Sequence, residues 1–302
     1  MCIRDRSRPR ISVVLPTMNE PHVGEIIERI KNTLRDYPLE IIVVDRSSDM
    51  TPDIARQAGA RIVFQRGRGY GDAYIQGFRE VTGDIVVMLD PDGTYLPEEI
   101  PRLLEPILRD EADIVIGNRW ANMKPGAMSS VNRFGNRFLT WLLNFLYHMD
   151  ISDSQSGMRA IRREALDGLQ LCHPGMPLAS EMIIEARKNN LRICEVPITY
   201  EKRLGETKQR IINGFLIAAE TLRLLRDYNP LLFFGCASFV FFLISFIFGA
   251  TSIYTYIATG SLRTPGRAIL SAMFFNSGVV LLMFALLLDL QVKLIRNSPP
   301  TR

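Results

Sequence analysis

The sequence predicts an α/β domain built on a mostly parallel sheet, followed by two membrane-spanning helices. Short apolar runs alternate with helical segments from residue 11 to residue 116. Asp45 and Asp90 each stand directly after one of these runs, and two long uncharged stretches lie near the C-terminus. Strands that alternate with helices are typical of a parallel sheet covered on both faces. Because ligands of such sheets bind beyond the carboxyl ends of the strands, we expect both aspartates to be functional.

The individual elements follow from the spacing of apolar residues. Short continuous runs predict buried strands at residues 11–15, 41–44, 61–64, 84–89, 113–116 and 193–199. Apolar side chains at helical spacing predict helices at residues 23–36, 51–58, 73–80, 97–108, 134–147 and 177–188. We expect these elements to form one domain over residues 11–210. Residues 1–10 lack an apolar run of signal-peptide length, and we expect a disordered or artefactual leader there.

The C-terminal part is dominated by apolar residues. Leu231–Ala250 and Ala268–Leu288 hold 20 and 21 residues without a charge, which is enough for each to cross a bilayer as a helix. The short connection at residues 259–267 predicts a hairpin within residues 230–290, with both ends on one side of the membrane. A tail follows at residues 291–302. Lys and Arg residues that flank the outer ends predict that the α/β domain lies on the cytoplasmic face.

The segment before the first apolar stretch is amphipathic. Residues 211–229 are typical of an interfacial helix, and equally of a helix packed on the domain core. Basic side chains crowd into residues 119–137, 159–163 and 187–226. Such a surface suits anionic lipid headgroups, or it is the positive flank of a membrane anchor. The sequence therefore predicts an integral membrane protein with the lipid bilayer as a partner.

Composition excludes several other classes of protein. The net charge of +4 is too weak and too dispersed to indicate a nucleic-acid partner. The four cysteines form no CxxC pair, so we expect neither a disulfide framework nor a zinc site. The three histidines also lack metal-ligand spacing.

The strongest chemical signal is the segment Asp90-Pro91-Asp92 at the end of a predicted strand. Two carboxylates separated by one residue on a turn can both reach a hard cation such as Mg²⁺ or Mn²⁺. A nucleoside diphosphate needs such an ion because its charge must be neutralised as it leaves. An exposed turn is the alternative reading of the same residues. After a continuous buried strand we favour metal ligation by both aspartates.

Seven segments carry a resemblance to a known family. They are VVLPTMNE (13–20), VVDRSSDMT (43–51), GRGYGDAY (67–74), VMLDPDGTY (87–95), IGNR (116–119), DSQSGMR (153–159) and VPITYEKRLGETK (196–208). In this order they resemble family-2 glycosyltransferases with the GT-A fold, and among these the dolichyl-phosphate mannose and glucose synthases. The resemblance implies an α/β, Rossmann-like GT-A catalytic domain that binds a nucleotide sugar and a polyprenyl phosphate.

The resemblance also implies roles for single residues. Those expected to bind the nucleotide are Pro16, Thr17, Asn19, Glu20, Asp45, Asp72 and Asp90. The metal would be held by Asp90 and Asp92, and the catalytic group comprises Asp92, Arg119 and Arg203. The acceptor phosphate and the sugar would be contacted by Arg133, Ser156, Arg159, Glu181 and Lys208. Arginine and lysine suit such a site because they form charge-assisted hydrogen bonds with phosphate.

The sequence departs from the family pattern at two positions. Arg46 follows Asp45 where the family often has a second acidic residue, and Thr94 stands where some relatives have a glutamine that completes the metal shell. Thr94 or water is the alternative third ligand. Gly67, Gly69 and Gly71 do not match the GxGxxG spacing; they form either a ligand-approach loop or a plain glycine-rich turn.

The implied reaction is an inverting transfer of a hexose from GDP-mannose or a UDP-hexose to a polyprenyl phosphate. A phosphate monoester is largely dianionic near neutral pH, so the acceptor needs no strong general base. The first alternative is a processive polysaccharide synthase, but its Q-x-x-R-W motif is not matched because residue 116 is Ile. The second is a non-catalytic membrane tether that binds a nucleotide or a lipid phosphate.

Overall fold

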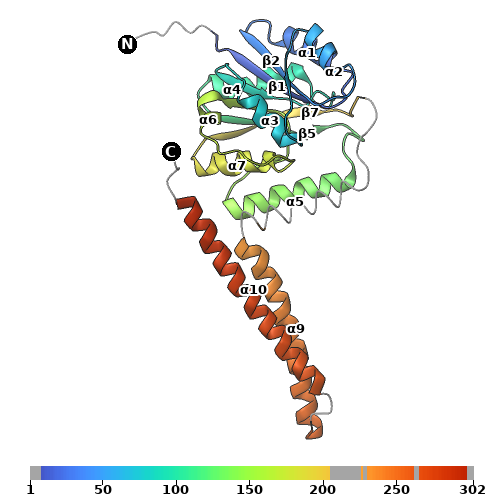
Figure 1. The fold of residues 1–302 in the computed structure, drawn as a ribbon, viewed down its shortest axis with the longest axis vertical. Helices are drawn as coiled ribbons and strands as arrows, with labels where there is room; N and C mark the ends of the chain where they lie inside the picture. The colour runs from blue at the N-terminus through green and yellow to red at the C-terminus, as the bar shows by residue number, and fades with distance from the viewer. Residues whose placement is uncertain (1–7, 205–225, 227–229, 262–264, 298–302) are drawn as a thin grey trace. The chain divides into compact units, whose positions relative to one another are not determined.

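The computed structural model describes residues 8–204, 226, 230–261 and 265–297 (Figure 1). Contacts within the chain divide it into two units, Met1–Gly214 and Phe215–Arg302. The predicted amphipathic helix at 211–229 and the residue Lys208 lie outside the described residues, apart from Arg226.

The first unit is built on a seven-stranded sheet of order β3-β2-β1-β4-β6-β5-β7. Its strands are β1 (Ile11–Thr17), β2 (Leu39–Asp45), β3 (Arg61–Phe64), β4 (Ile85–Met88), β5 (Ile114–Met123), β6 (Arg159–Arg162) and β7 (Ile193–Tyr200). All neighbouring pairs are parallel except those of β6, which runs antiparallel to both β4 and β5. The predicted mostly parallel α/β sheet is therefore confirmed.

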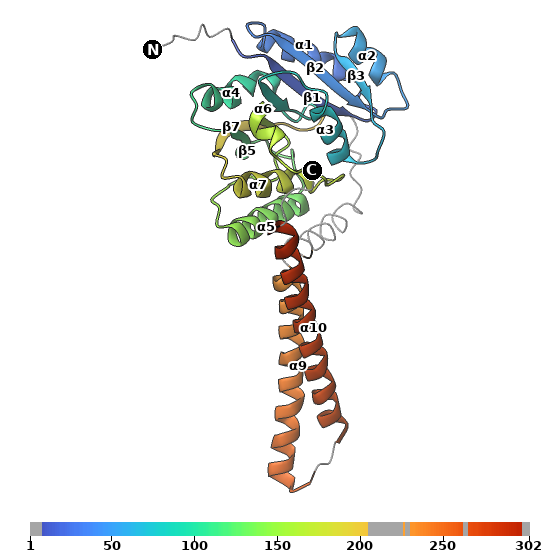
Figure 2. The same ribbon diagram turned by 60° about the vertical axis from the view of Figure 1, so that its left-hand side comes forward.

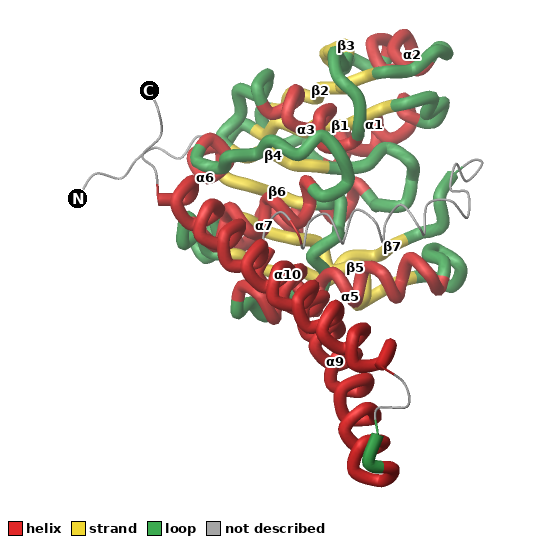
Figure 3. Tube along the Cα trace, turned by 60° about the horizontal axis from the view of Figure 1, so that its bottom comes forward, coloured by secondary structure: helices red, strands yellow, loops and turns green. Residues whose placement is uncertain are grey.

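Helices cover both faces of this sheet (Figures 2 and 3). They are α1 (Val23–Thr33), α2 (Thr51–Gln57), α3 (Tyr70–Phe78), η1 (Pro97–Glu99), α4 (Ile100–Leu108), α5 (Ser130–Tyr147), α6 (Arg163–Asp167) and α7 (Leu178–Lys188). One apolar core joins the sheet to α1, α2 and α4, and a second joins the other face to α3, α6 and α7. Successive strand side chains alternate between these cores: Val13 and Leu15 enter the first, and Val14 the second.

The sequence did not predict β6 or α6. The four residues of β6 read Arg-Ala-Ile-Arg, which has no apolar run, yet Arg159 is fully buried. Helix α3 begins three residues earlier than expected, after Gly69 with a φ of 111°. Helix α5 also begins earlier, because the Ser129 side chain accepts a hydrogen bond from the Asn132 amide and caps the helix.

The second unit contains the predicted pair of apolar helices, α9 (Pro230–Thr259) and α10 (Pro265–Asn297). By length and composition, Pro230–Thr259 and Pro265–Val292 can each cross a membrane, with mean hydropathies of 2.6 and 2.1. Ser245 and Ser271 each donate a hydroxyl hydrogen bond to the other's backbone carbonyl, at 2.8 and 2.9 Å. Small residues such as these let two helices approach closely in lipid. The two helices therefore pack along each other as a hairpin.

Candidate active site

The carboxyl ends of the parallel strands gather the predicted site residues at one edge of the sheet. Thr17 and Asp45 are paired in register at the ends of β1 and β2. Asp90 follows β4, which is the other neighbour of β1. Arg203 follows β7 and contacts Glu20 in the loop after β1 and Asp92 in the loop after β4. The topology thus brings together residues that are far apart in the sequence.

Asp90 is held by two phenols. Tyr70 and Tyr74, one turn apart on α3, both donate hydrogen bonds to the same carboxylate oxygen at 3.0 Å. The other oxygen lies against Gly157, where an added Cβ would stand only 2.5 Å away. Burial, and secondly the charge of Asp92, raises the pKa of Asp90 to about 6. A nearby cation would therefore stabilise its ionised form.

Asp92 lies on the turn that follows. Its Oδ1 accepts hydrogen bonds from the Thr94 hydroxyl at 2.6 Å and the Thr94 amide at 3.1 Å. Its Oδ2 lies 3.5 Å from the Arg203 guanidinium, which also pairs with Glu20. The segment after β7 is fixed to this turn, because the Leu204 amide donates to the Asp92 carbonyl at 3.0 Å. One cation thus balances two carboxylates at the sheet edge.

These residues fit a divalent metal ion. Asp90 and Asp92 offer hard oxygen donors, and the pKa of Asp90 is raised first by burial and then by the neighbouring charge of Asp92. Mg²⁺ is commonly held by one or two carboxylates together with substrate phosphates and water. The described residues contain no group of three or more His, Cys, Asp or Glu that could hold a metal alone. The Thr94 hydroxyl donates to Asp92 at 2.6 Å and keeps its oxygen lone pairs, so Thr94 and water both stay candidates for the third ligand.

Arg119 on β5 forms a buried ion pair with Asp153. Its Nε and Nη2 each donate to one Asp153 oxygen at 2.7 Å, and its backbone amide donates to the same carboxylate at 3.0 Å. The guanidinium lies 5.3 Å from the centre of the Tyr200 ring. Arg119 also lowers the pKa of Asp90 through its charge, although burial and Asp92 outweigh it. Arg119 is therefore electrostatically coupled to the acidic pair.

The predicted nucleotide residues form a hydrogen-bonded junction between the loops after β1 and β2. Asp45 is 1% exposed and accepts hydrogen bonds from the hydroxyls of Thr17 at 2.7 Å and Ser47 at 2.6 Å. Asn19 accepts from the Ser48 amide at 2.9 Å and has a positive φ of 55°. Pro16 lies within β1, and the Glu20 amide donates to the Thr51 hydroxyl. The direct contact of these residues with a nucleotide stays a prediction.

The glycine-rich segment packs against the chain's own backbone. A Cβ at Gly69 would stand 2.3 Å from the Pro174 carbonyl oxygen, and one at Gly71 would stand 2.2 Å from that of His173. Asp72 accepts a hydrogen bond from Gln65, and its amide donates to Pro174 at 2.9 Å. These glycines therefore permit a close approach between two loops. A nucleotide contact by Asp72 stays a prediction.

The predicted acceptor residues have different surroundings. Arg159 donates to the carbonyls of Ser154, Ser156 and Ala179 at 2.7 to 2.9 Å, and so holds the loop before β6. Glu181 is 1% exposed and accepts from the amides of Cys172 and His173. Ser156 is fully buried, and its hydroxyl has no hydrogen-bond partner among the described residues. Arg133 is exposed on the first turn of α5. Their contact with an acceptor stays a prediction.

Comparison with known proteins identifies the family of this chain. The sequence profile described as glycosyl transferase family 2 matches residues 12–169. The chain belongs to glycosyltransferase family 2. The predicted resemblance is thereby confirmed.

Three relatives of this glycosyltransferase come from Haloferax volcanii. The low-salt glycan biosynthesis hexosyltransferase Agl6 is 42% identical over 66% of this chain and 49% of its own length, so the chain spans about half of that relative. Glycosyltransferase AglJ is 33% identical over 95% of both chains. A dolichyl-phosphate hexose transferase is 36% identical over 66% of this chain and 86% of its own.

A solved structure with the same fold is glucosyl-3-phosphoglycerate synthase from Mycobacterium tuberculosis in complex with Mn²⁺, UDP-glucose and phosphoglyceric acid. It is 26% identical, with a TM-score of 0.60, and the match covers 72% of this chain and 79% of that one. The predicted GT-A class of fold is confirmed by this likeness together with the sheet.

Several residues of this glycosyltransferase contact the predicted site residues, although the sequence did not indicate a role for them. They are Tyr70, Tyr74, Tyr95, Asp153 and Gly157. Tyr70 and Tyr74 are four residues apart, which places them on one side of a helix. That signal was missed because the predicted helix began after Tyr70. The Tyr95 hydroxyl accepts a hydrogen bond from the Gly157 amide at 2.7 Å, a contact that no local pattern indicates.

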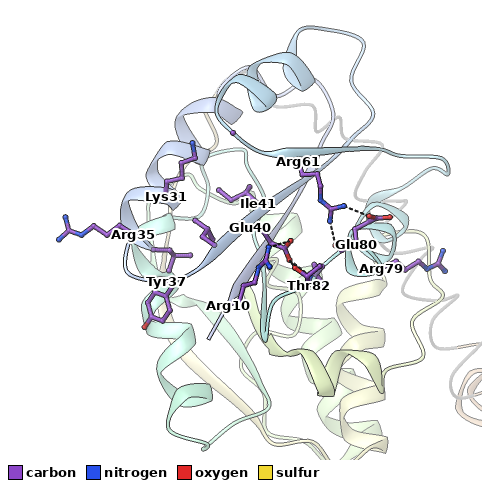
Figure 4. A pocket seen from close by; sticks show the side chains of 14 residues that line it. Arg10, Lys31, Arg35, Tyr37, Glu40, Ile41, Arg61, Arg79, Glu80 and Thr82 are labelled. Carbon is purple, nitrogen blue, oxygen red and sulfur yellow. Dashed lines mark hydrogen bonds and ion pairs between the residues drawn. The ribbon is translucent and has the colours of Figure 1, made fainter. Parts of the chain in front are cut away.

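A surface hollow of about 930 Å³ lies at the opposite, amino-terminal edge of the sheet (Figure 4). Four of its charged side chains form two ion pairs: Arg61 lies 2.8 Å from Glu80, and Arg10 lies 3.6 Å from Glu40. The acidic pair Asp90 and Asp92 follows β4 at the other, carboxyl edge of the sheet.

Proposed function

We propose that the chain transfers a hexose from a nucleoside diphosphate sugar to a polyprenyl phosphate, with Mg²⁺ or Mn²⁺. The observation that carries this proposal is the acidic pair Asp90 and Asp92 beside Arg119 and Arg203, in a chain that also holds two helices long and apolar enough to cross a membrane. A dolichyl-phosphate hexose transferase among the relatives supports the acceptor class. The complex of the fold neighbour with Mn²⁺ and UDP-glucose supports the donor class and the metal.

The acidic and the basic residues of the site would have different roles. Asp90 and Asp92 would hold the metal ion, which supplies positive charge to the departing diphosphate. Arg203 already faces Asp92 and Glu20, so its guanidinium stands where a diphosphate bound at the acidic pair would need a donor. Arg119 adds fixed positive charge from inside the sheet. Electrostatic stabilisation and positioning then account for most of the catalysis.

The reaction would be a single displacement. An oxygen of the acceptor phosphate forms a bond to the anomeric carbon while the bond from that carbon to the diphosphate breaks. The nucleoside diphosphate leaves with the electron pair, and the configuration at the carbon is inverted. No side chain needs to remove a proton, because the acceptor phosphate is already largely ionised near neutral pH.

We infer that the site faces the cytoplasm. Lys and Arg residues flank the outer ends of the two apolar segments, including Arg226, Lys293 and Arg296, while Arg263 and Arg267 in the connection oppose this bias. A polyprenyl tail stays in the bilayer, so a membrane-anchored enzyme keeps its active site close to the acceptor phosphate.

The test is a transfer assay with the full chain in membranes. The protein is incubated with Mn²⁺ or Mg²⁺, a polyprenyl phosphate and a panel of radiolabelled GDP- and UDP-sugars, and the lipid is extracted. Label in the lipid that is lost in Asp92→Ala supports the proposal and names the donor. Asp53→Ala, which removes an exposed carboxylate paired with Arg56, is the matched control and should keep full activity.

Two outcomes would contradict the proposal. Label in a polymer and not in the extracted lipid would favour a polysaccharide synthase. Binding of nucleotide or lipid phosphate without transfer, unchanged in Asp92→Ala, would favour a tether.

A further inference from the structure

Asn276 is a polar side chain within the apolar part of α10. It lies in the uncharged run between Arg267 and Asp289, and its side chain is exposed on the surface of the helix. A carboxamide carries two N–H donors and one carbonyl acceptor. The hydrocarbon core of a bilayer offers no partner to any of these groups. Among the residues that the structure describes, none forms a hydrogen bond with the Asn276 side chain.

The hydroxyl groups of the two helices are satisfied within the hairpin. All serine and threonine side chains of α9 donate to backbone carbonyls; they are Ser238, Ser245, Thr251, Ser252, Thr255 and Thr259. Ser271 of α10 does the same. A serine such as Ser277 can reach the carbonyl four residues earlier by rotation about one bond. One such contact satisfies a hydroxyl, but it leaves most of a carboxamide unpaired.

Helix α9 lies on the opposite side of α10 from Asn276. The Ser271 hydroxyl and the Gly278 carbonyl both form hydrogen bonds with α9, at 2.9 and 2.7 Å. A Cβ at Gly278 would stand only 2.9 Å from the Phe242 ring of α9. At 3.6 residues per turn, Asn276 lies about 140° around the helix from Ser271 and about 160° from Gly278. The partner of Asn276 therefore comes from outside the hairpin.

The side of α10 that carries Asn276 is otherwise apolar and exposed. Its other residues recur at intervals of three and four; they are Ile269, Ala272, Met273, Val280 and Met283. We call these five residues and Asn276 the Asn276 face. Ala272 is one turn before Asn276, and a small residue at that position lets another helix approach closely. Lipid tails suit the apolar residues of this face, but they leave the carboxamide unsatisfied.

We propose that the Asn276 face joins two copies of this chain, with the two Asn276 carboxamides hydrogen-bonded to each other. Two copies inserted in the same direction are related by a two-fold axis along the membrane normal, which places both carboxamides at the same depth. A carboxamide is complementary to itself, because each copy can donate an N–H group to the carbonyl of the other. The inference rests on the membrane insertion of α9 and α10, which is part of the proposed function. It holds whichever sugar donor or acceptor the enzyme uses.

Cross-linking tests the position of the contact. The full chain, with its four cysteines replaced by alanine, receives one new cysteine and is oxidised in the membranes of the expressing cells. Val280→Cys lies on the Asn276 face, one turn after Asn276. Leu282→Cys is the matched control, because residue 282 lies on a different side of the helix and is exposed to a similar degree, 38% against 43%. We expect a covalent dimer for Val280→Cys and little for Leu282→Cys. Equal cross-linking at the two positions would overturn the proposal.

The contribution of the carboxamide is measured by energy transfer between donor-labelled and acceptor-labelled copies of the full chain in vesicles. Dilution with lipid gives the association constant. Asn276→Leu should weaken association by about tenfold, because interhelical hydrogen bonds of this kind are lost. Asn276→Gln keeps the carboxamide and should retain most of the association. Ser277→Ala, which removes the neighbouring hydroxyl, should leave it unchanged. Equal association of Asn276→Leu and the unaltered chain would contradict the proposal.

Flotation of the same vesicles at alkaline pH separates the two levels of inference. A chain that floats with the vesicles but shows no energy transfer at any dilution would overturn the dimer alone, and would favour a different protein as the partner of Asn276. A chain that does not float would overturn the membrane anchor of the proposed function, and the dimer with it.

Discussion

Arg119 and Asp153 form a bidentate ion pair in which both side chains are almost completely buried, 34 residues apart in the sequence. Asp153 is itself fixed, because its amide and that of Ser152 donate to the two carboxylate oxygens of Glu195 on β7 at 2.8 and 2.7 Å. A chain of charged contacts therefore runs from β7 through the loop before β6 to the arginine on β5. Asp153 acts as a positioning residue for Arg119.

Removal of Asp153 should therefore cost both stability and activity. Asp153→Ala leaves a buried guanidinium unpaired, which typically costs about 3–5 kcal/mol of unfolding free energy. The Arg119→Met/Asp153→Asn double variant should regain much of that stability, because the asparagine oxygen can still accept from the backbone amide of residue 119. It should not regain activity. Thermal melting and lipid-transfer rates measured on both variants check this, and recovery of activity would exclude a catalytic role for Arg119.

Asp90 should destabilise the metal-free protein at neutral pH. Its pKa in the fold is raised to about 6, above its ordinary value, so the folded state holds a proton that the unfolded state releases first. Stability therefore falls as pH rises through this window. Asp90→Asn removes the cost and should stabilise the metal-free protein at pH 7.5 by about 1–3 kcal/mol while transfer is lost. Melting in the presence of chelator checks the sign; the difference should disappear near pH 4.

The two phenols on Asp90 should set the acidic limit of activity. Their hydrogen bonds lower the pKa of Asp90, although burial and the charge of Asp92 raise it more. Tyr74→Phe should therefore raise this pKa further, and protons should compete with the metal at a higher pH. The measurement is the pH profile of kcat/KM at subsaturating Mn²⁺, whose acidic limb should move to higher pH. Tyr37→Phe, at the amino-terminal edge of the sheet, is the control and should leave the limb in place.

Gly157 should tolerate no side chain. A Cβ there would lie 2.5 Å from an Asp90 carboxylate oxygen and 3.0 Å from the Tyr70 hydroxyl, so one of these groups must move. We expect Gly157→Ala to lower transfer activity and to raise the Mn²⁺ concentration needed for half-maximal rate. Gly168→Ala is the control, because its nearest neighbour would be 3.4 Å away. Unchanged metal dependence in Gly157→Ala would show that Asp90 is not a ligand in this geometry.

Local patterns in the sequence were sufficient for much of the fold. The apolar runs of β1, β2 and β4 mark buried strands because both faces of a parallel sheet are covered, and the two uncharged stretches mark the helices α9 and α10. The acidic pair was also visible, because Asp90 follows a buried run directly. Such features depend on residues that are close together in the sequence, within one helix or strand, and can therefore be predicted from the sequence alone.

Only the tertiary structure decided which of the charged residues meet. Arg203 contacts Glu20, which is 183 positions away in the sequence. Arg119 on β5 contacts Asp153 in the loop before β6, and β6 is an antiparallel strand that no apolar run predicts. Arg159 and Glu181 each hold a loop by bonding to its backbone, a role that the sequence did not indicate, and their contact with an acceptor stays a prediction. The sequence does not show whether a charged side chain binds a phosphate or a buried backbone group. The contact depends on chain segments that are brought together only by folding.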